Sequence, residues 1–257
     1  MPFHIAHTAV AFGAAFIAGM INSVAGGGTL VSFPALIWLG LNSVQANATS
    51  TVAIWPGSVG GMWGYRRELA TADRMLLALV IPSLIGGIAG AWLLKFTPPS
   101  LFDKLAPFLI LFATVLFMVQ SPIQRMMAKP QPGGHKSTQW LAGAMLFQLL
   151  VALYGGYFGA GIGILMLAAL SILGLTDIHQ MNGLKNLFAL SINGIAALYF
   201  IWAQMVSWAD VVTMAIGAVI GGYLCAGVAR RMGRTAVRRI VIIVGFVMAI
   251  SLFVKKW

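Results

Sequence analysis

The chain has few charged residues and almost no cysteine. Only 8% of its 257 residues are Asp, Glu, Lys or Arg, and Cys225 is its one cysteine. A single cysteine excludes an internal disulfide and a cysteine-rich metal cluster, so Cys225 is expected to pack as a small apolar side chain. Because 60% of the residues are hydrophobic, the composition does not suit a soluble domain.

Carboxylates and histidines are also scarce. The sequence puts the carboxylates near the ends of apolar segments and no histidine inside one. They are Glu68, Asp73, Asp103, Asp177, Asp210, His4, His7, His135 and His179. Proton-coupled transporters usually bury such groups along the path. The sequence therefore predicts no proton relay, no metal site, no cofactor and no catalytic residues, which makes an intramembrane enzyme the weakest interpretation.

Acidic residues are outnumbered by 16 Lys and Arg residues, which give a net charge of +11. These basic residues lie between apolar runs and form no patch, so nucleic-acid binding is not expected. Basic loops on one side of a membrane are typical of polytopic proteins. The first 13 residues hold no Lys or Arg and therefore lack the basic region of a cleaved signal peptide, so the first apolar run is expected to remain as a membrane helix.

The sequence predicts an all-α polytopic membrane protein, a single domain over residues 1–257. Ten apolar segments are expected at 8–25, 29–39, 46–64, 75–94, 101–119, 139–158, 162–173, 182–203, 211–229 and 237–254. The lipid bilayer is thus the expected partner, in a bacterial-type inner (plasma) membrane. Oligomeric state is left open.

The ten segments form two halves, residues 1–120 and 140–257, joined by a polar linker at 121–139 that is expected to be an exposed loop. Leu39-Gly40-Leu41 matches Leu173-Gly174-Leu175, and Gly86-Gly87 matches Gly221-Gly222, at offsets of 134 and 135. The halves are therefore interpreted as an internal repeat of about eight full spans plus two short segments.

The second segment of each half is too short to cross a membrane. Twelve residues of helix rise about 18 Å, against a hydrocarbon core of about 30 Å. Glycines precede both segments, and Gly40 and Gly174 end them, followed by expected caps at Asn42-Ser43 and Thr176-Asp177. This pattern predicts half-helices with unwound flanks.

Loop charges predict the orientation. An odd number of crossings in each half puts the linker at 121–139, the loop of Arg66, Arg67 and Arg74, and the arginine-rich loop at 230–239 in the cytoplasm. Both termini would then lie outside, and the two halves would be inverted relative to each other. Inverted repeats with broken helices are a recurring plan of transporters.

Two of the apolar helices carry the same polar stripe. Its members, in corresponding pairs 135 residues apart, are Asn47 and Asn182, Ser50 and Lys185, Thr51 and Asn186, and Ser58 and Asn193. On a helix, each set falls on one face, within about 100° of arc. Such residues often only join neighbouring helices, but eight in matched sets favour two stripes that face each other around a substrate. Trp55, beside the first stripe, is open to two interpretations: a gate or core packing.

Lys185 is the one basic residue well inside an apolar segment. It either extends to the cytoplasmic surface, one turn from the segment's start, or lines a site where an anion neutralises it. Free N–H groups at the start of a short helix also suit an anion, and glycine exposes them. Gly27, Gly28, Gly161 and Gly163 are therefore predicted to contact the substrate together with the two stripes.

Three motifs in the first half identify a resemblance: NSVAGGGTL at residues 22–30, FPAL at 33–36 and ANATS at 46–50. The chain resembles the TauE/SafE family of sulfite exporters, also called the toluene sulfonate uptake permeases. The resemblance implies a carrier of sulfite, thiosulfate or small organosulfonates with about eight spanning helices. The second half departs from the pattern at Gly159-Ala160-Gly161-Ile162-Gly163 and at Gly183-Leu184-Lys185.

The residues and the resemblance together favour export of a small sulfur oxyanion, with sulfite the leading candidate. The first alternative is an ion-coupled carrier of organosulfonates or thiosulfate. The second is a membrane assembly protein whose stripes only hold helices together.

Overall fold

The computed structural model describes residues 2–24, 27–70, 72–127, 138–173, 175, 177–232 and 234–256, and in these ranges the regular structure is all helical. The helices are α1 (Pro2–Val24), α2 (Thr29–Trp38), α3 (Ser43–Gly64), α4 (Arg66–Ala70), α5 (Arg74–Leu77), α6 (Val80–Phe96), α7 (Pro99–Met127), α8 (Thr138–Tyr157), α9 (Ile162–Ile172), α10 (Ile178–Trp202), α11 (Trp208–Met232) and α12 (Arg234–Lys256). The predicted all-α class is confirmed.

Several helices are long and apolar enough to cross a membrane. The described residues contain four such spans: Ile5–Asn22, Met75–Phe96, Pro99–Val119 and His179–Trp202. Shorter apolar helices accompany them, including Ala142–Tyr157, Trp208–Tyr223 and Val241–Val254. Large apolar side chains on the outer faces are exposed, such as Leu146, Ile216 and Ile250. Outer faces of this kind suit contact with lipid, so the chain is an integral membrane protein.

The two short helices occur where they were predicted. α2 has 10 residues and α9 has 11, so each rises only about 15 Å. Gly40, with φ +101°, terminates α2, and Asn42 Oδ1 then accepts the N–H of Gln45 at 2.9 Å to cap α3. Asp177 likewise caps α10. Gly174 and Thr176 lie outside the described residues.

The predicted start of the linker was wrong, and two short helices in another loop were not expected. α7 continues to Met127, so residues 121–127 are helical, although the linker was expected to be a loop from residue 121. Ile123, Gln124, Met126 and Met127 are residues that a helix tolerates well, so the helix persists beyond the apolar segment. Two short helices, α4 and α5, also occupy the loop before α6.

Helices α1 and α10 begin earlier in the chain than predicted, so two ionisable residues lie farther inside a helix than expected. α1 begins at Pro2 and not near residue 8, and His7 lies within its apolar span Ile5–Asn22, which corrects the prediction that no histidine lies inside an apolar segment. α10 begins at Ile178 and not at residue 182, which puts Lys185 about two turns from the helix start. Hydropathy locates an apolar stretch, whereas the helix continues into the polar residues beside it.

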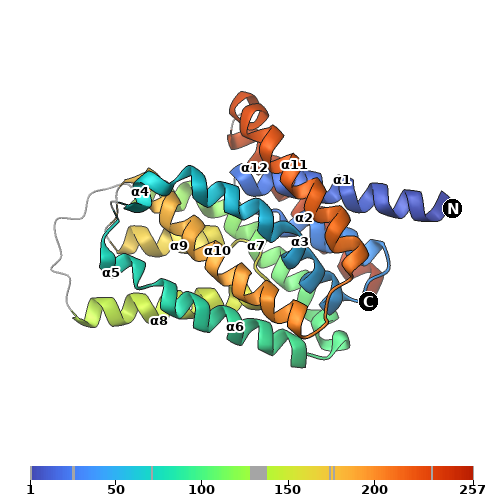
Figure 1. Cartoon of the computed structure of the whole chain (residues 1–257), viewed down its shortest axis with the longest axis horizontal. Coiled ribbons are helices and arrows are strands. Elements are labelled where there is room, and N and C mark those ends of the chain that lie inside the picture. The colour runs from blue at the N-terminus through green and yellow to red at the C-terminus, as the bar shows by residue number, and fades with distance from the viewer. Residues whose placement is uncertain are drawn as a thin grey trace.

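α3 and α10 pack against each other in opposite directions (Figure 1). Gly183, near the start of α10, lies against Tyr65, just beyond the end of α3. At the opposite end, the N–H of Ser207 donates to Thr49 Oγ1 at 3.0 Å. Midway, the Trp55 indole N–H donates to the Leu190 carbonyl at 3.2 Å, which assigns Trp55 a packing role.

Helices α3 and α10 are each flanked by a closely packed helix pair. The pair α1 and α11 lies beside α3, and the pair α6 and α8 lies beside α10. Glycines permit the close approach, because a Cβ at Gly221 would collide with the Phe16 carbonyl and a Cβ at Gly86 with Ala152. Figure 1 shows the start of α1 and the end of α12 on one side of the molecule, with α4, α5 and the start of α8 on the opposite side.

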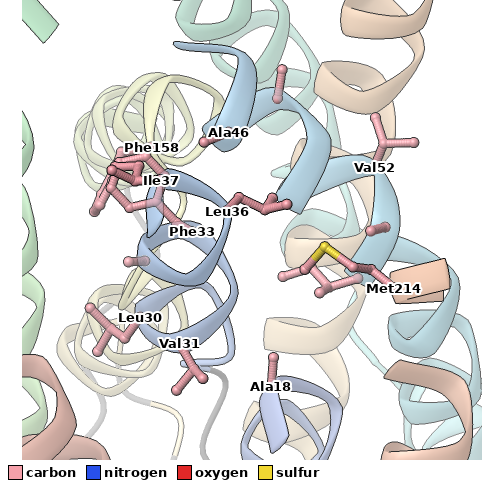
Figure 2. Packing of buried hydrophobic residues seen from close by; sticks show 14 of the residues in the cluster. Ala18, Leu30, Val31, Phe33, Leu36, Ile37, Ala46, Val52, Phe158 and Met214 are labelled. Atoms are coloured by element: carbon pink, nitrogen blue, oxygen red, sulfur yellow. The ribbon is translucent and has the colours of Figure 1, made fainter. Parts of the chain in front are cut away.

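α2 is apolar on all sides and is buried from Thr29 to Ile37. In Figure 2, Phe33 and Ile37 lie beside Phe158, while Leu36 points toward α3. The ring of Phe158, in the connection between α8 and α9, meets the Phe33 ring edge-on at 5.4 Å. The short helix of one half therefore packs against the break of the other half.

The close contact between α6 and α8 predicts that an added methyl group lowers stability at Gly86 but not at Gly143. A Cβ at Gly86 would stand 2.6 Å from both the Ala152 Cβ and the Leu149 carbonyl oxygen, so Gly86→Ala should lower stability by about 1–3 kcal/mol. Gly143→Ala in α8, where nothing lies within 4 Å, is the matched control. Thermal unfolding of the purified protein in detergent should show a loss for the first variant alone; equal losses would contradict the packing.

Candidate functional site

The predicted site residues gather around two interruptions of the helical backbone. The first break separates α1 from α2, and the second separates α8 from α9. Gly28 is the N-cap of α2 and Gly161 the N-cap of α9, and neither helix start has a side-chain hydrogen bond as a cap. Gly161 and Gly159 have φ values of +79° and +81°, a conformation in which glycine is favoured.

The first break is lined by the stripe of α3. Ser50 Oγ lies 2.6 Å from Ser32 Oγ in α2, and Ser32 Oγ in turn donates to the Gly28 carbonyl at 3.2 Å. Further along α3, Ser58 Oγ accepts a 3.4 Å hydrogen bond from Asn22 Nδ2, near the end of α1. The stripe therefore contacts the helix before the break and the helix after it.

The stripe of α10 meets the second break in the corresponding way. The carbon stem of Lys185 packs on Gly163 in the first turn of α9, with Lys185 Cδ 3.3 Å from where a Cβ of residue 163 would stand. Asn193 Oδ1 lies 3.5 Å from the corresponding point on Gly159. Ser50 and Lys185 therefore each contact the short helix that follows a break, whereas Ser58 contacts α1 and Asn193 approaches the residues between α8 and α9. Lys185 is half-buried, and its predicted contact with a substrate stays a prediction.

One of the contacts between the halves reaches the second break. Asn47 Nδ2 donates to the carbonyl of Tyr157, the last residue of α8, at 2.9 Å. Thr51 Oγ1 instead donates to the Asn47 carbonyl within α3, also at 2.9 Å, and both side chains are buried. Asn182 and Asn186 are half-buried on the same helix as Lys185. That the two stripes face each other stays a prediction.

Gly27 and Gly28 are the predicted substrate-binding residues at the first break. Gly27 and Gly28 are buried, and a Cβ on Gly27 would collide with the Phe117 ring, while one on Gly28 would stand 2.5 Å from the Ala18 carbonyl oxygen. Larger residues therefore do not fit without displacing α1 or α7. The close approach explains these two glycines without a ligand, so their predicted contact with substrate stays a prediction.

Sequence reasoning missed a buried acidic group near one end of the molecule. Asp210, in the first turn of α11, is only 5% exposed. Its Oδ1 lies 2.8 Å from His7 Nε2 in α1, and its Oδ2 accepts the Ser207 hydroxyl at 2.7 Å. Because 203 residues separate His7 from Asp210, no local pattern signals the pair. The pair joins α1 to α11 outside the two breaks.

The family model described as Sulfite exporter TauE/SafE matches residues 11–252, nearly the whole chain. The chain belongs to the TauE/SafE family. It is a membrane transporter by that membership, which agrees with its apolar spans.

Curated relatives match over similar lengths. A "Probable membrane transporter protein" of Haemophilus influenzae is 29% identical over 251 residues, covering 93% of this chain and 92% of the relative. "Probable membrane transporter protein YfcA" of Escherichia coli K12 is 26% identical over 249 residues, covering 95% and 88%. "Probable membrane transporter protein ORF9" of Sinorhizobium sp. is 26% identical over 257 residues, covering 98% and 94%. No solved structure matches.

The His7–Asp210 contact predicts a coupled effect on stability. Asp210→Ala leaves the Ser207 hydroxyl and His7 without their acceptor, and His7→Ala removes only one of the two bonds. In thermal unfolding of the wild type, both single variants and the double variant, the losses should fall short of additivity by about 1 kcal/mol. Fully additive losses would show that the two side chains do not interact.

Proposed function

We propose that the protein exports a small sulfur oxyanion, with sulfite as the leading candidate, through a site between two inverted repeats. The repeats would comprise residues 1–120 and 140–257, joined by the linker at 121–139. Antiparallel packing of α3 and α10, which correspond at an offset of 135, supports the inversion. So does the recurrence of equivalent helix pairs, α1 with α11 and α6 with α8.

The observation that carries the proposal is the Lys185–Gly163 contact. It brings the stem of Lys185, which lies within the span His179–Trp202, onto the first turn of a short helix whose start lacks a side-chain cap. A helix start offers unpaired N–H donors and the positive end of the helix dipole, and Lys185 adds a full positive charge. Converging positive charge of this kind at membrane depth suits an oxyanion.

The neutral groups of the site supply hydrogen bonds. Asn47, Ser50, Thr51, Ser58, Asn182, Asn186 and Asn193 would contact the substrate's oxygens around the two breaks, together with the backbone at Gly27, Gly28, Gly161 and Gly163. Oxyanions accept several hydrogen bonds at once, and exposed backbone N–H groups provide donors that need no side-chain ordering.

The membrane potential alone can drive export of an anion, without a coupling ion. With the cell interior negative, each unit of negative charge that leaves gains about 2.3 kcal/mol per 100 mV. In the proposed orientation, the cytoplasmic side carries the linker and the 230–239 loop, and both termini lie outside. Arg66 and Arg67 of α4 lie on the side opposite the start of α1 and the end of α12, which supports this orientation (Figure 1).

A second candidate is proton-coupled transport of organosulfonates or thiosulfate. The His7–Asp210 pair, in which the carboxylate is buried, favours it, because an ionisable pair within a membrane protein is a candidate proton carrier. The pair lies outside the two breaks, however, so the site around Lys185 is common to both candidates.

The role of Lys185 predicts a loss of transport without a loss of folding. Lys185→Gln keeps the stem against Gly163 and removes the charge, so sulfite efflux from proteoliposomes should fall at least about tenfold, the worth of one charge-assisted contact. Lys185→Arg, which keeps the charge, is the control. If Lys185→Gln lowers the unfolding temperature but leaves flux per folded protein unchanged, the lysine only holds helices together, as in an assembly protein.

The driving force predicts how flux responds to voltage. In proteoliposomes with an imposed potential and no pH gradient, sulfite should leave the negative compartment, and reversing the potential should reverse the flux. A singly charged species would reach a concentration ratio of about fifty per 100 mV. Flux that instead follows the pH gradient and disappears in Asp210→Asn would favour the proton-coupled candidate.

A further inference from the structure

The two proposed repeats exchange helices with each other. At the offsets of 134 and 135, α1, α2, α3, α6 and α7 correspond to α8, α9, α10, α11 and α12. Yet α1 packs on α11 and α2 on α12, while α8 packs on α6 and α9 on α7. The long and short membrane helices therefore group into a first bundle (α1, α2, α3, α11 and α12) and a second bundle (α6, α7, α8, α9 and α10). Each bundle holds three helices of one half and two of the other.

Inside each bundle, helices pack backbone against backbone. A Cβ at Gly19 in α1 would collide with the carbonyl of Ala218 in α11, and a Cβ at Gly156 in α8 would collide with the carbonyl of Gly87 in α6. Helices in such close contact cannot slide or rotate past each other without a backbone collision. Each of these pairs is therefore expected to move as one body.

The bundles meet where α3 packs on α10 and α7 on α12, and there side chains separate the backbones. A Cβ at Gly194 in α10 would approach the Trp55 indole of α3, and a Cβ at Gly245 in α12 would collide with the Thr114 side chain of α7. Among the glycines that the structure describes, none collides with the backbone of the other bundle. Side chains can change rotamer as packed helices slide, so the interface between the bundles is the easier place for a shear motion.

Both breaks face the opposite bundle. The Asn47 amide of α3 donates to the carbonyl of Tyr157, at the end of α8. At the first break, a Cβ at Gly27 would collide with the Phe117 ring of α7. A movement of one bundle against the other therefore changes the contacts of both breaks at once.

We propose that transport proceeds by a shear of the first bundle against the second along the α3–α10 and α7–α12 interfaces. Because the proposed function places the substrate at the breaks, this inference rests on it and specifies which bodies move. Gly183 in α10 lies against Tyr65 and Leu69 at the cytoplasmic end of the proposed orientation, two residues before Lys185. That contact closes the α3–α10 interface, so it separates when the site opens to the cytoplasm.

Movement of residues 1–120 against residues 140–257 is the alternative that the sequence repeat alone suggests. It requires α1 to leave α11 and α6 to leave α8. These pairs hold the backbone contacts of Gly19 and Gly156, which are the tightest kind of packing in the described part of the chain. The exchange of helices therefore favours the bundles as the moving bodies.

A disulfide across the interface tests the movement. In a Cys225→Ala background, Tyr65→Cys and Gly183→Cys place two Cβ atoms 3.4 Å apart, close to the ~3.8 Å found in disulfides. Sulfite efflux from proteoliposomes should fall in proportion to the cross-linked fraction and return on reduction. The two single-cysteine variants, oxidised in the same way, are the controls. Unchanged efflux from the cross-linked protein overturns the proposal.

A second link distinguishes the bundles from the halves. Lys95 in α6 and Trp202 in α10 belong to different halves but to the same bundle, with the ammonium 5.1 Å from the ring. Lys95→Cys and Trp202→Cys, joined by a flexible bifunctional thiol reagent, should transport as fast as the same variant before linking. Loss of efflux on linking would show that the halves move, and this result also overturns the proposal.

Spin labels give a readout that needs no substrate. Leu146 in α8 and Ile216 in α11 are exposed on different bundles, whereas Leu146 and Phe96 in α6 are exposed on one bundle but lie in different halves. The distance distribution between labels should be broad or split for the first pair and single and narrow for the second. Equally narrow distributions overturn the proposal. Absence of sulfite efflux from the unlinked protein would instead overturn the proposed function, and the label distances would still decide which bodies move.

Discussion

A hydrocarbon layer offers no water to a backbone N–H or C=O group, so a chain that interrupts its helices at membrane depth must satisfy those groups by other means. The second break shows how this chain does so. The Tyr154 hydroxyl donates to the Ala160 carbonyl at 2.8 Å, and Asn47 donates to the Tyr157 carbonyl. Both bonds satisfy acceptors, and neither caps the start of α9. The donors that remain there are the basis of the proposed anion site.

The surrounding helices hold the breaks in place by close packing and aromatic contacts. Gly86 and Gly221 let their helices approach α8 and α1 at backbone distance, and Phe33 packs on Phe158. Near the end of α10, the Lys95 ammonium lies 5.1 Å from the Trp202 ring and joins α6 to α10. Rigid flanking pairs of this kind give the short helices a fixed frame, since α2 and α9 are too short to be stable by themselves.

The positions of the main helical segments could be predicted, but several of their ends and most side-chain partners could not. Short segments flanked by glycine identified α2 and α9, and Asn42 and Asp177 identified two helix caps. A stripe of polar residues has a helical period, so its face could be predicted from spacing alone. The residues that these side chains contact in other helices show no such periodic pattern in the sequence.

Three particular features show where that limit lies. Ser32 stands in an otherwise apolar helix, and nothing local indicates that it meets Ser50. His7 was assigned to a region before the first helix because hydropathy marks only the apolar part of α1, and its partner lies on α11. The helical residues 121–127 were missed for the complementary reason, because helix propensity persists where hydropathy ends.

Selenite, a heavier analogue of sulfite with an anomalous X-ray signal, tests the central claim most directly. In crystals soaked with selenite, the account predicts an anomalous selenium peak within hydrogen-bond reach of the Lys185 ammonium and the first backbone N–H groups of α9, and its loss in Lys185→Gln. A bound selenite elsewhere in the protein, with the Lys185 ammonium directed toward lipid headgroups, would contradict the account.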